Sequence, residues 1–184
     1  LARTGFDVVG LDTHAPTIAA LNAGQDPNGE VADASVGDST AAFTNAADDL
    51  AGCTAFIIAV PTPITDAKAP DLGPVLGACA TIAPHLTDGA LVVLESTVYP
   101  GCTEEDCVPI VEKTAGLTAG KDFKFGYSPE RIVPGDKVRT LTTILKIVSG
   151  NDAEALEEIS AVYNHIIKAG IHKAASIKVA EAAK

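Results

Sequence analysis

Residues 90–97 have the sequence Ala-Leu-Val-Val-Leu-Glu-Ser-Thr, an uninterrupted apolar run that ends in one carboxylate and two hydroxyl side chains. An apolar run without polar alternation is typical of a strand buried on both faces of a parallel sheet. Residues 56–60, Phe-Ile-Ile-Ala-Val, form a second run of this kind, and an Ala-rich helical stretch lies between the two. This alternation predicts the α/β class with a doubly wound parallel sheet.

The same pattern continues along the chain. Residues 25–38 are rich in Asp, Asn, Gly and Ser, which favours a surface loop, and the signal for a short strand around Phe43 is weak. Functional residues are expected just beyond the carboxyl ends of the strands, where such sheets bind ligands. The expected strands are 7–12, 56–60, 90–94, 123–127 and 143–148, and the expected helices are 16–23, 72–84, 103–114, 153–167 and one from about residue 176.

Composition and charge restrict the class of protein. The chain has 184 residues, 47% of them apolar, and a formal charge of −11 from 13 basic and 24 acidic side chains. The apolar content is too high for disorder, and no apolar run approaches the roughly 18 residues that cross a bilayer. The scattered Lys and Arg disfavour a nucleic-acid partner. The cysteines and histidines lack metal-site or disulfide spacing, so we expect reduced thiols, no bound metal and a cytoplasmic protein.

Asp12 follows the first expected strand, where a dinucleotide-binding sheet places the carboxylate that accepts hydrogen bonds from the adenosine ribose. A carboxylate there also repels a 2′-phosphate, which favours NAD over NADP. A helix N-cap is the alternative role. The glycine fingerprint that normally precedes this acid is missing, and residues 1–4 with Gly5 suit the last turn and C-cap of its helix. We therefore expect the chain to begin after the first, central strand of a 3-2-1-4-5-6 sheet.

Two later strand ends contain hydroxyl side chains. Thr62 lies between two prolines that stiffen the turn after residues 56–60, so its hydroxyl can face a cofactor; a simple strand terminator is the alternative. Thr97 follows residues 90–94 and can order a water or a cofactor amide, the alternative being an N-cap of the next helix.

Charged residues follow the next expected strand and the last expected helix. Glu130 beside Arg131, in the Pro- and Gly-rich loop after residues 123–127, can act as a base next to a phosphate or substrate clamp. A solvated surface ion pair is the alternative. Glu181 and Lys184 lie three residues apart in the final Ala-rich helix, where a helix-surface pair is the ordinary interpretation.

Four strings occur in order and at a characteristic spacing: VPTPI, ESTVYPGCTEE, GYSPERIVPGDK and HKAASIKVAEAAK. Together they resemble the UDP-glucose/GDP-mannose dehydrogenase family, and especially its bacterial branch that acts on UDP-N-acetylhexosamines. The resemblance covers essentially the whole chain. It implies a Rossmann-like NAD-binding domain over residues 1–170, and over 171–184 the start of a long helix that links to central and UDP-binding domains and through which members form homodimers.

The resemblance also implies an activity and residue roles. Members oxidise the C6 alcohol of a UDP-sugar to a uronate for polysaccharide biosynthesis, in two NAD-dependent steps with a cysteine nucleophile. By this resemblance Thr97 holds the catalytic water near the nicotinamide, Glu130 is the general base and Lys184 is the catalytic lysine. The remaining implied contacts are with NAD, from Asp12, Thr62 and Thr97, and with the UDP-sugar, from Glu130, Arg131, Ile132 and Lys184.

The chain departs from the family pattern in two respects. No cysteine matches the nucleophile, so Cys102 and Cys107 are not candidates, and the phosphate-binding loop is absent. Residues 1–184 alone are therefore expected to bind NAD poorly and to lack complete oxidation activity. Two alternative functions remain. One is a β-hydroxyacid dehydrogenase, whose NAD-binding domain has the same topology and which also uses a helix lysine. The other is a non-catalytic nucleotide-binding or oligomerisation module. The VPTP and YSPERI strings disfavour the first.

Overall fold

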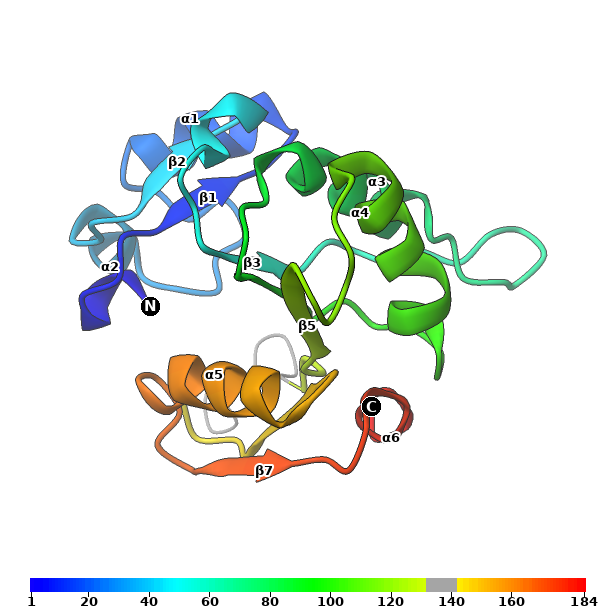
Figure 1. The fold of residues 1–184 in the computed structure, drawn as a ribbon. Coiled ribbons are helices and arrows are strands. Elements are labelled where there is room, and N and C mark those ends of the chain that lie inside the picture. Colours follow the sequence, from blue (N-terminus) through cyan, green and yellow to red (C-terminus); the bar gives the residue numbers. More distant parts are fainter. Residues whose placement is uncertain (132–141) are drawn as a thin grey trace. The chain divides into compact units, whose positions relative to one another are not determined.

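The computed structural model describes residues 1–131 and 142–184. In it the chain forms two compact units, one made of Leu1–Ala51 and the other of residues 52–131 and 142–184 (Figure 1). Each unit is described by itself below. Ile132, for which substrate contact is expected, lies outside the described residues.

The first unit contains a two-stranded parallel sheet in which Gly10 pairs with Phe43. The strand at Phe43 is thus confirmed, and so is the left-handed C-cap at Gly5, whose φ is 94°. The expected loop 25–38 differs, because it contains a five-residue helix too short to show an apolar period. The elements are the 3-10 turn η1 (Ala2–Thr4), β1 (Val9–Leu11), α1 (Ala15–Asn22), α2 (Asp33–Gly37), β2 (Ala42–Thr44) and the 3-10 turn η2 (Ala47–Leu50).

The second unit contains a five-stranded sheet in the order β3-β4-β5-β6-β7. Its strands are β3 (Ala55–Ile58), β4 (Ala90–Leu94), β5 (Phe123–Tyr127), β6 (Lys146–Gly150) and β7 (Ile171–Lys173). Its helices are α3 (Gly73–Ile82), the 3-10 turn η3 (Ala83–His85), the π-helical turn η4 (Thr103–Cys107), α4 (Val108–Ala115), α5 (Ala153–Asn164) and α6 (Ile177–Ala182).

Alternate side chains of β4 face two different helical layers. Leu91 and Val93 pack in one apolar cluster with Ile159 and Tyr163 of α5. Val92 and Leu94 instead line a small apolar cavity of about 20 Å³ shared with residues of α3 and α4. The period of two is that of a strand, and all five residues of β4 are buried. Helices on both faces confirm the doubly wound α/β class (Figure 1).

The sheet departs from the expected all-parallel arrangement at β6. This strand is antiparallel to β5, with Tyr127 opposite Ser149, whereas β3, β4 and β5 are parallel to one another. A parallel neighbour requires a crossover, usually a helix, and the described part of the connection between β5 and β6 contains none.

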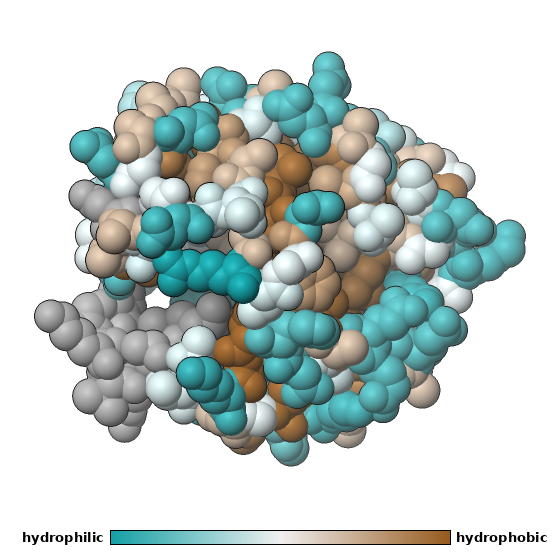
Figure 2. Space-filling model, turned by 90° about the vertical axis from the view of Figure 1, so that its left-hand side faces the viewer, coloured by the Kyte–Doolittle hydropathy of each residue, from teal (hydrophilic) through white to brown (hydrophobic). Residues whose placement is uncertain are grey.

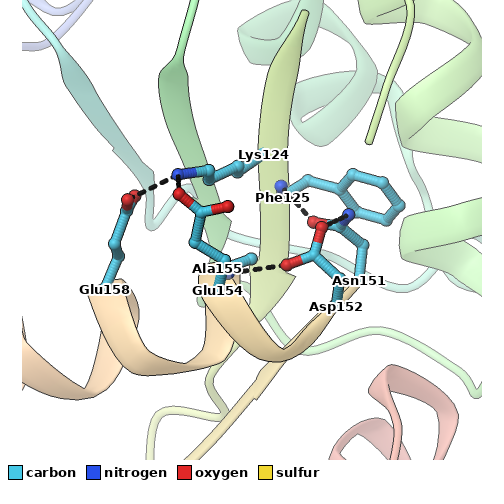
Figure 3. Close-up of polar contacts among 7 residues, drawn as sticks. All are labelled: Lys124, Phe125, Asn151, Asp152, Glu154, Ala155 and Glu158. Carbon is cyan, nitrogen blue, oxygen red and sulfur yellow. Dashed lines mark hydrogen bonds and ion pairs between the residues drawn. The ribbon is translucent and has the colours of Figure 1, made fainter. Parts of the chain in front are cut away.

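Polar contacts hold the start of α5 against β5, as Figure 3 shows. Asp152 is the N-cap of α5 and accepts the Ala155 N–H at 2.8 Å, while the Asn151 side chain accepts the Phe125 N–H at 2.9 Å. Lys124 bridges from β5 to Glu154 and Glu158 on α5, at 2.8 and 2.5 Å. The orientation of α5 is therefore set by hydrogen bonds at its first two turns.

Residues 171–184 do not form one helix. Ile171–Lys173 is strand β7, which pairs parallel with β6, and the helix begins at Ile177 after the N-cap Ser176. The helix expected from about residue 176 is therefore confirmed, whereas strand β7 was not expected, because three residues without apolar alternation give no periodic signal. That residues 171–184 begin the link to further domains stays a prediction. A domain boundary at 170 stays a prediction.

The surface drawn in Figure 2 intersperses hydrophilic side chains with apolar ones. Among the described residues, no helix combines the length and the apolar character that crossing a membrane requires.

Candidate functional site

The turn after β4 is held from both neighbouring strands. The buried Ser96 hydroxyl donates to the Val60 carbonyl at 2.7 Å, and the buried Tyr127 hydroxyl donates to the Ser96 carbonyl at 3.2 Å. Thr97, the next residue, is exposed. Cys102, not Thr97, is the N-cap residue of the helical segment that follows, which removes the capping alternative. The structure thus presents the Thr97 side chain to solvent from a rigid turn.

Glu95, directly after β4, belongs to a buried polar cluster that sequence reasoning missed. Its Oε1 accepts from Lys146 Nζ and from the Tyr163 hydroxyl, both at 2.6 Å. Lys146 Nζ also lies 4.8 Å from the centroid of the Tyr163 ring, which suits a cation–π contact. The Lys146 side chain is only 6% exposed. A lysine in the middle of the apolar residues 144–148 was the available signal.

The loop after β5 starts from buried residues and then becomes accessible. Ser128 is fully buried and its hydroxyl donates to the Ile147 carbonyl at 2.7 Å, and Pro129 is also buried. Glu130 is half-buried, and Arg131 is exposed with Nη1 3.4 Å from the Leu145 carbonyl oxygen. Glu130 is therefore placed by a rigid strand end.

Lys184 reaches the same loop. Its ammonium donates to the Glu130 carbonyl oxygen, so the structure brings these two expected catalytic residues together. Among the described residues, no hydrogen bond or ion pair joins Thr97 to either of them. Glu181 is not the partner of Lys184 in a helix-surface pair, because its side chain is buried, at 2% exposure, and bonds elsewhere.

Asp12 and Thr62, two of the three residues expected to contact NAD, lie in different units. Asp12, exposed after β1, accepts the His14 N–H through Oδ1 at 2.7 Å, and His14 itself is the N-cap residue of α1. Asp12 thus forms a turn before the helix instead of capping it. Thr62 Oγ1 is a buried oxygen without a hydrogen-bond partner among the described residues.

These features fit a bound dinucleotide. A buried hydroxyl without a partner is unfavourable by itself, and a polar group of a ligand would satisfy it. The exposed Asp12 carboxylate bonds the described part of the chain through only one oxygen, which leaves the other for a ribose hydroxyl. Within its own unit, each of the two side chains therefore offers a polar oxygen of the kind that a dinucleotide contacts.

Two of the buried cysteines, Cys102 and Cys107, are not suited to nucleophilic chemistry. Cys79, Cys102 and Cys107 are free thiols inside the second unit. A hydrogen bond to Cys107, together with burial, raises the pKa of Cys102. Cys102 in turn lowers the pKa of Cys107, but the bond to Cys79 and burial outweigh it, so that pKa is raised as well. Both thiols stay protonated near neutral pH, and a thiol is a poor nucleophile. In the described residues no cluster of His, Cys, Asp and Glu could hold a metal ion.

Comparison with known proteins agrees with this fold. Residues 1–167 match the NAD-binding domain of the UDP-glucose/GDP-mannose dehydrogenase family. The chain is 50% identical over 177 residues to Protein CapL of Staphylococcus aureus, and 50% identical over 178 residues to UDP-N-acetyl-D-glucosamine 6-dehydrogenase of Pseudomonas aeruginosa. Each match covers 96% of this chain, which spans only 42% of the length of either relative.

Solved structures show the same architecture. The UDP-D-ManNAc dehydrogenase from Pyrococcus horikoshii superimposes with a TM-score of 0.88 and 31% identity, covering 97% of this chain and 44% of that one. A ternary complex of GDP-mannose dehydrogenase from Pseudomonas aeruginosa gives a TM-score of 0.91, over 100% of this chain and 44% of that one, at 23% identity, a likeness that shows the fold alone. The chain therefore belongs to the UDP-glucose/GDP-mannose dehydrogenase family, whose NAD-binding domain it contains.

Proposed function

We propose that this domain belongs to an enzyme that uses NAD to oxidise the C6 alcohol of a UDP-sugar, a UDP-N-acetylhexosamine, to the uronate. The observation that carries the proposal is the contact between the Lys184 ammonium and the loop at Glu130, at the carboxyl end of β5. The UDP-N-acetyl-D-glucosamine 6-dehydrogenase named above, at 50% identity, supports the choice of substrate. NAD, when bound, accepts the hydride in each of the two oxidation steps.

The residues of this chain supply charge stabilisation and proton transfer. The Lys184 ammonium stabilises the C6 alkoxide and later the tetrahedral oxyanion, an effect commonly worth about 3 kcal/mol per donor in a dry site. Glu130, next to the buried Pro129, takes the proton from the water that attacks the acyl carbon, a contribution of roughly 10²–10⁴-fold. Thr97 orients that water, and Arg131 contacts the sugar nucleotide together with Ile132.

Substitution of the two charged residues tests these roles. In the whole polypeptide that carries this domain, we expect Lys184→Ala and Glu130→Gln each to lower kcat by at least tenfold and to leave NAD affinity nearly unchanged, because both act at the sugar. Steady-state kinetics and calorimetry with NAD are the measurements. The exposed Lys121→Ala and Glu157→Gln are matched controls. Undiminished turnover in either test variant removes that residue from the mechanism, and oxidation of a small β-hydroxyacid but not a UDP-sugar refutes the proposal.

The preference for NAD has its own test. Replacing Asp12 by Asn removes the negative charge that repels a 2′-phosphate and keeps the side-chain shape. We expect Asp12→Asn to weaken NAD binding and to raise the affinity for NADP relative to NAD, measured by titration of each cofactor. Thr62→Val is expected to weaken both cofactors alike. An unchanged NAD/NADP ratio in Asp12→Asn would show that Asp12 does not face the ribose.

We also propose that the enzyme is a homodimer, as the family resemblance implies, and cytoplasmic, as its free cysteines favour. Light scattering of the purified protein tests the oligomeric state. Residues 1–184 by themselves are expected to bind NAD weakly, because they contain no glycine-rich phosphate-binding loop, and not to complete the oxidation, because none of their cysteines matches the nucleophile of the family.

A further inference from the structure

Glu181 is a buried carboxylate to which the proposed reaction assigns no part. Its Oε2 accepts the Gly101 N–H at 2.5 Å. Its Oε1 accepts both the Thr103 N–H, at 2.9 Å, and the Thr103 hydroxyl, at 2.7 Å. The partners lie 78 to 80 residues away in the sequence, and the side chain is 2% exposed. A carboxylate removed from water in this way is stable only because several donors converge on it.

The donors belong to the turn that follows Thr97. Gly101 has a φ of 103°, a conformation that L side chains rarely adopt, and a Cβ there would meet Glu105 Oε1 at 3.0 Å. This backbone conformation accompanies the N–H bond to Glu181. Thr103 adds a second N–H and a hydroxyl at the start of η4. The turn at residues 100–103 thus provides the three hydrogen-bond donors that bind one carboxylate.

The same carboxylate fixes the position of Lys184. Residues 177, 180, 181 and 184 share one helical face, and the first three are buried. The Lys184 N–H donates to the Glu181 carbonyl at 3.4 Å, which continues the last turn of α6. The Lys184 ammonium then reaches Glu130. A continuous path therefore runs from the turn after Thr97, through Glu181, to Lys184 and the loop at Glu130.

We propose that Glu181 is a positioning residue: its carboxylate, bound by Gly101 and Thr103, holds α6 so that the Lys184 ammonium faces Glu130. This rests on the proposed role of Lys184. Glu181 does not touch the reacting atoms. An exposed ion pair, Lys178 to Glu105 at 2.7 Å, joins the same two segments from outside, but such pairs contribute little.

The test is a double-mutant cycle in the whole enzyme. We expect Glu181→Gln to lower kcat by about 10- to 100-fold, because a misplacement near 1 Å can cost 10²-fold, with KM for NAD unchanged. In the Lys184→Ala background the same substitution is expected to have no further effect, since the ammonium it positions is gone. A role in general stability would instead multiply the two losses, and that outcome overturns the inference, as does full activity of Glu181→Gln.

Three further measurements keep the test decisive. Thr103→Val is expected to lower kcat and Thr103→Ser to retain it, because Ser keeps the hydroxyl donor. Glu112→Gln is the matched control, since Glu112 also accepts a backbone N–H, from Ala119 at 2.9 Å, but at the other end of α4; its kcat should equal that of the parent. Hydrogen exchange of residues 177–184 needs no substrate: faster exchange in Glu181→Gln supports the inference, and unchanged exchange overturns it. If Lys184→Ala alone retains turnover, the proposed catalytic role of Lys184 fails, while the exchange result still decides whether Glu181 holds α6.

Discussion

Glu95 shows how one side chain can join three parts of the second unit. It follows β4, its cationic partner Lys146 begins β6, and the Tyr163 hydroxyl comes from α5. Because β5 lies between β4 and β6 in the sheet, the cluster spans the strand that leads to Glu130. A buried ion pair contributes little net stability, but loss of one partner leaves an uncompensated charge in the interior.

Lys146→Met tests this cost. We expect the substitution to lower the free energy of unfolding by about 3–5 kcal/mol, because the Glu95 carboxylate loses its counter-charge. Urea unfolding near neutral pH measures it. The double variant Lys146→Met/Glu95→Gln should recover most of the loss, since the amide oxygen still accepts from Tyr163. Lys173→Met is the control: its pair with Glu157 is exposed, and the expected change is about 0–1 kcal/mol. Equal effects of the two lysine substitutions would contradict the argument.

At the scale of elements, glycine lets α5 approach the sheet. Gly126 in β5 lies so close to β6 and α5 that a Cβ there would meet the Ser149 carbonyl oxygen and Ile159 Cδ1 at less than 3 Å. Gly150 is equally confined, since its Cβ would lie 2.5 Å from the Leu156 N. The contact of α5 with β5 and β6 is therefore made by backbone against helix, and leaves no room for a methyl group.

At this scale we expect two glycine substitutions to change the free energy of unfolding in opposite directions. Gly126→Ala is expected to destabilise the protein by about 1–3 kcal/mol or more, because backbone atoms must shift. Gly77→Ala, in the exposed interior of α3 with nothing near the added carbon, is expected to stabilise it by about 0.5–1 kcal/mol. Thermal and urea unfolding measure both. A Gly126→Ala protein as stable as the parent would show that α5 does not pack this closely.

For the whole molecule, titrating groups limit stability on both sides of neutral pH. Backbone N–H groups, chiefly that of Val31, hold the pKa of Asp26 below its usual range, and the Thr118 N–H does the same for Asp122. The hydrogen bond to Asp106 raises the pKa of Tyr99 to about 12. Burial raises the pKa of Tyr127. Burial and the nearby Glu95 charge together raise the pKa of Tyr163.

These shifts predict the shape of the stability curve. A carboxyl group with a lowered pKa stabilises the folded state at pH values above 3.8, which is its pKa in the unfolded chain. This contribution disappears as the pH falls below 3.8 toward the lower pKa of the folded state. A phenol with a raised pKa stabilises the folded state below pH 10, which is its pKa in the unfolded chain. This contribution disappears as the pH rises from 10 toward 12. Unfolding free energies should therefore fall below about pH 4 and above pH 10, and Tyr99→Phe should weaken the alkaline fall. Stability that rises above pH 10 would contradict the Tyr99 assignment.

Sequence reasoning was most accurate where local chemistry is decisive. The strands 90–94 and 123–127 were predicted to the residue, because the first is a short continuous apolar run and the second places an aromatic residue at every other position. The helix from 153 was predicted with its start, which Asp152 caps. The direction of β6 and the existence of β7 were missed, since pairing depends on a partner strand and not on the pattern within the strand itself.

The sequence by itself determined the fold class, the family, and the residue types present after the strands, such as Thr97 and Glu130, and after the last helix, where Lys184 lies. Their assigned roles stay proposals. Only the tertiary structure decided that Glu181 is buried against Gly101 and Thr103 and that Lys146 pairs with Glu95. The physical reason is separation along the chain. Propensity and periodicity act over one or two turns, whereas these hydrogen bonds join residues 51 to 80 positions apart. Tertiary packing alone selects which of these distant donors and acceptors meet.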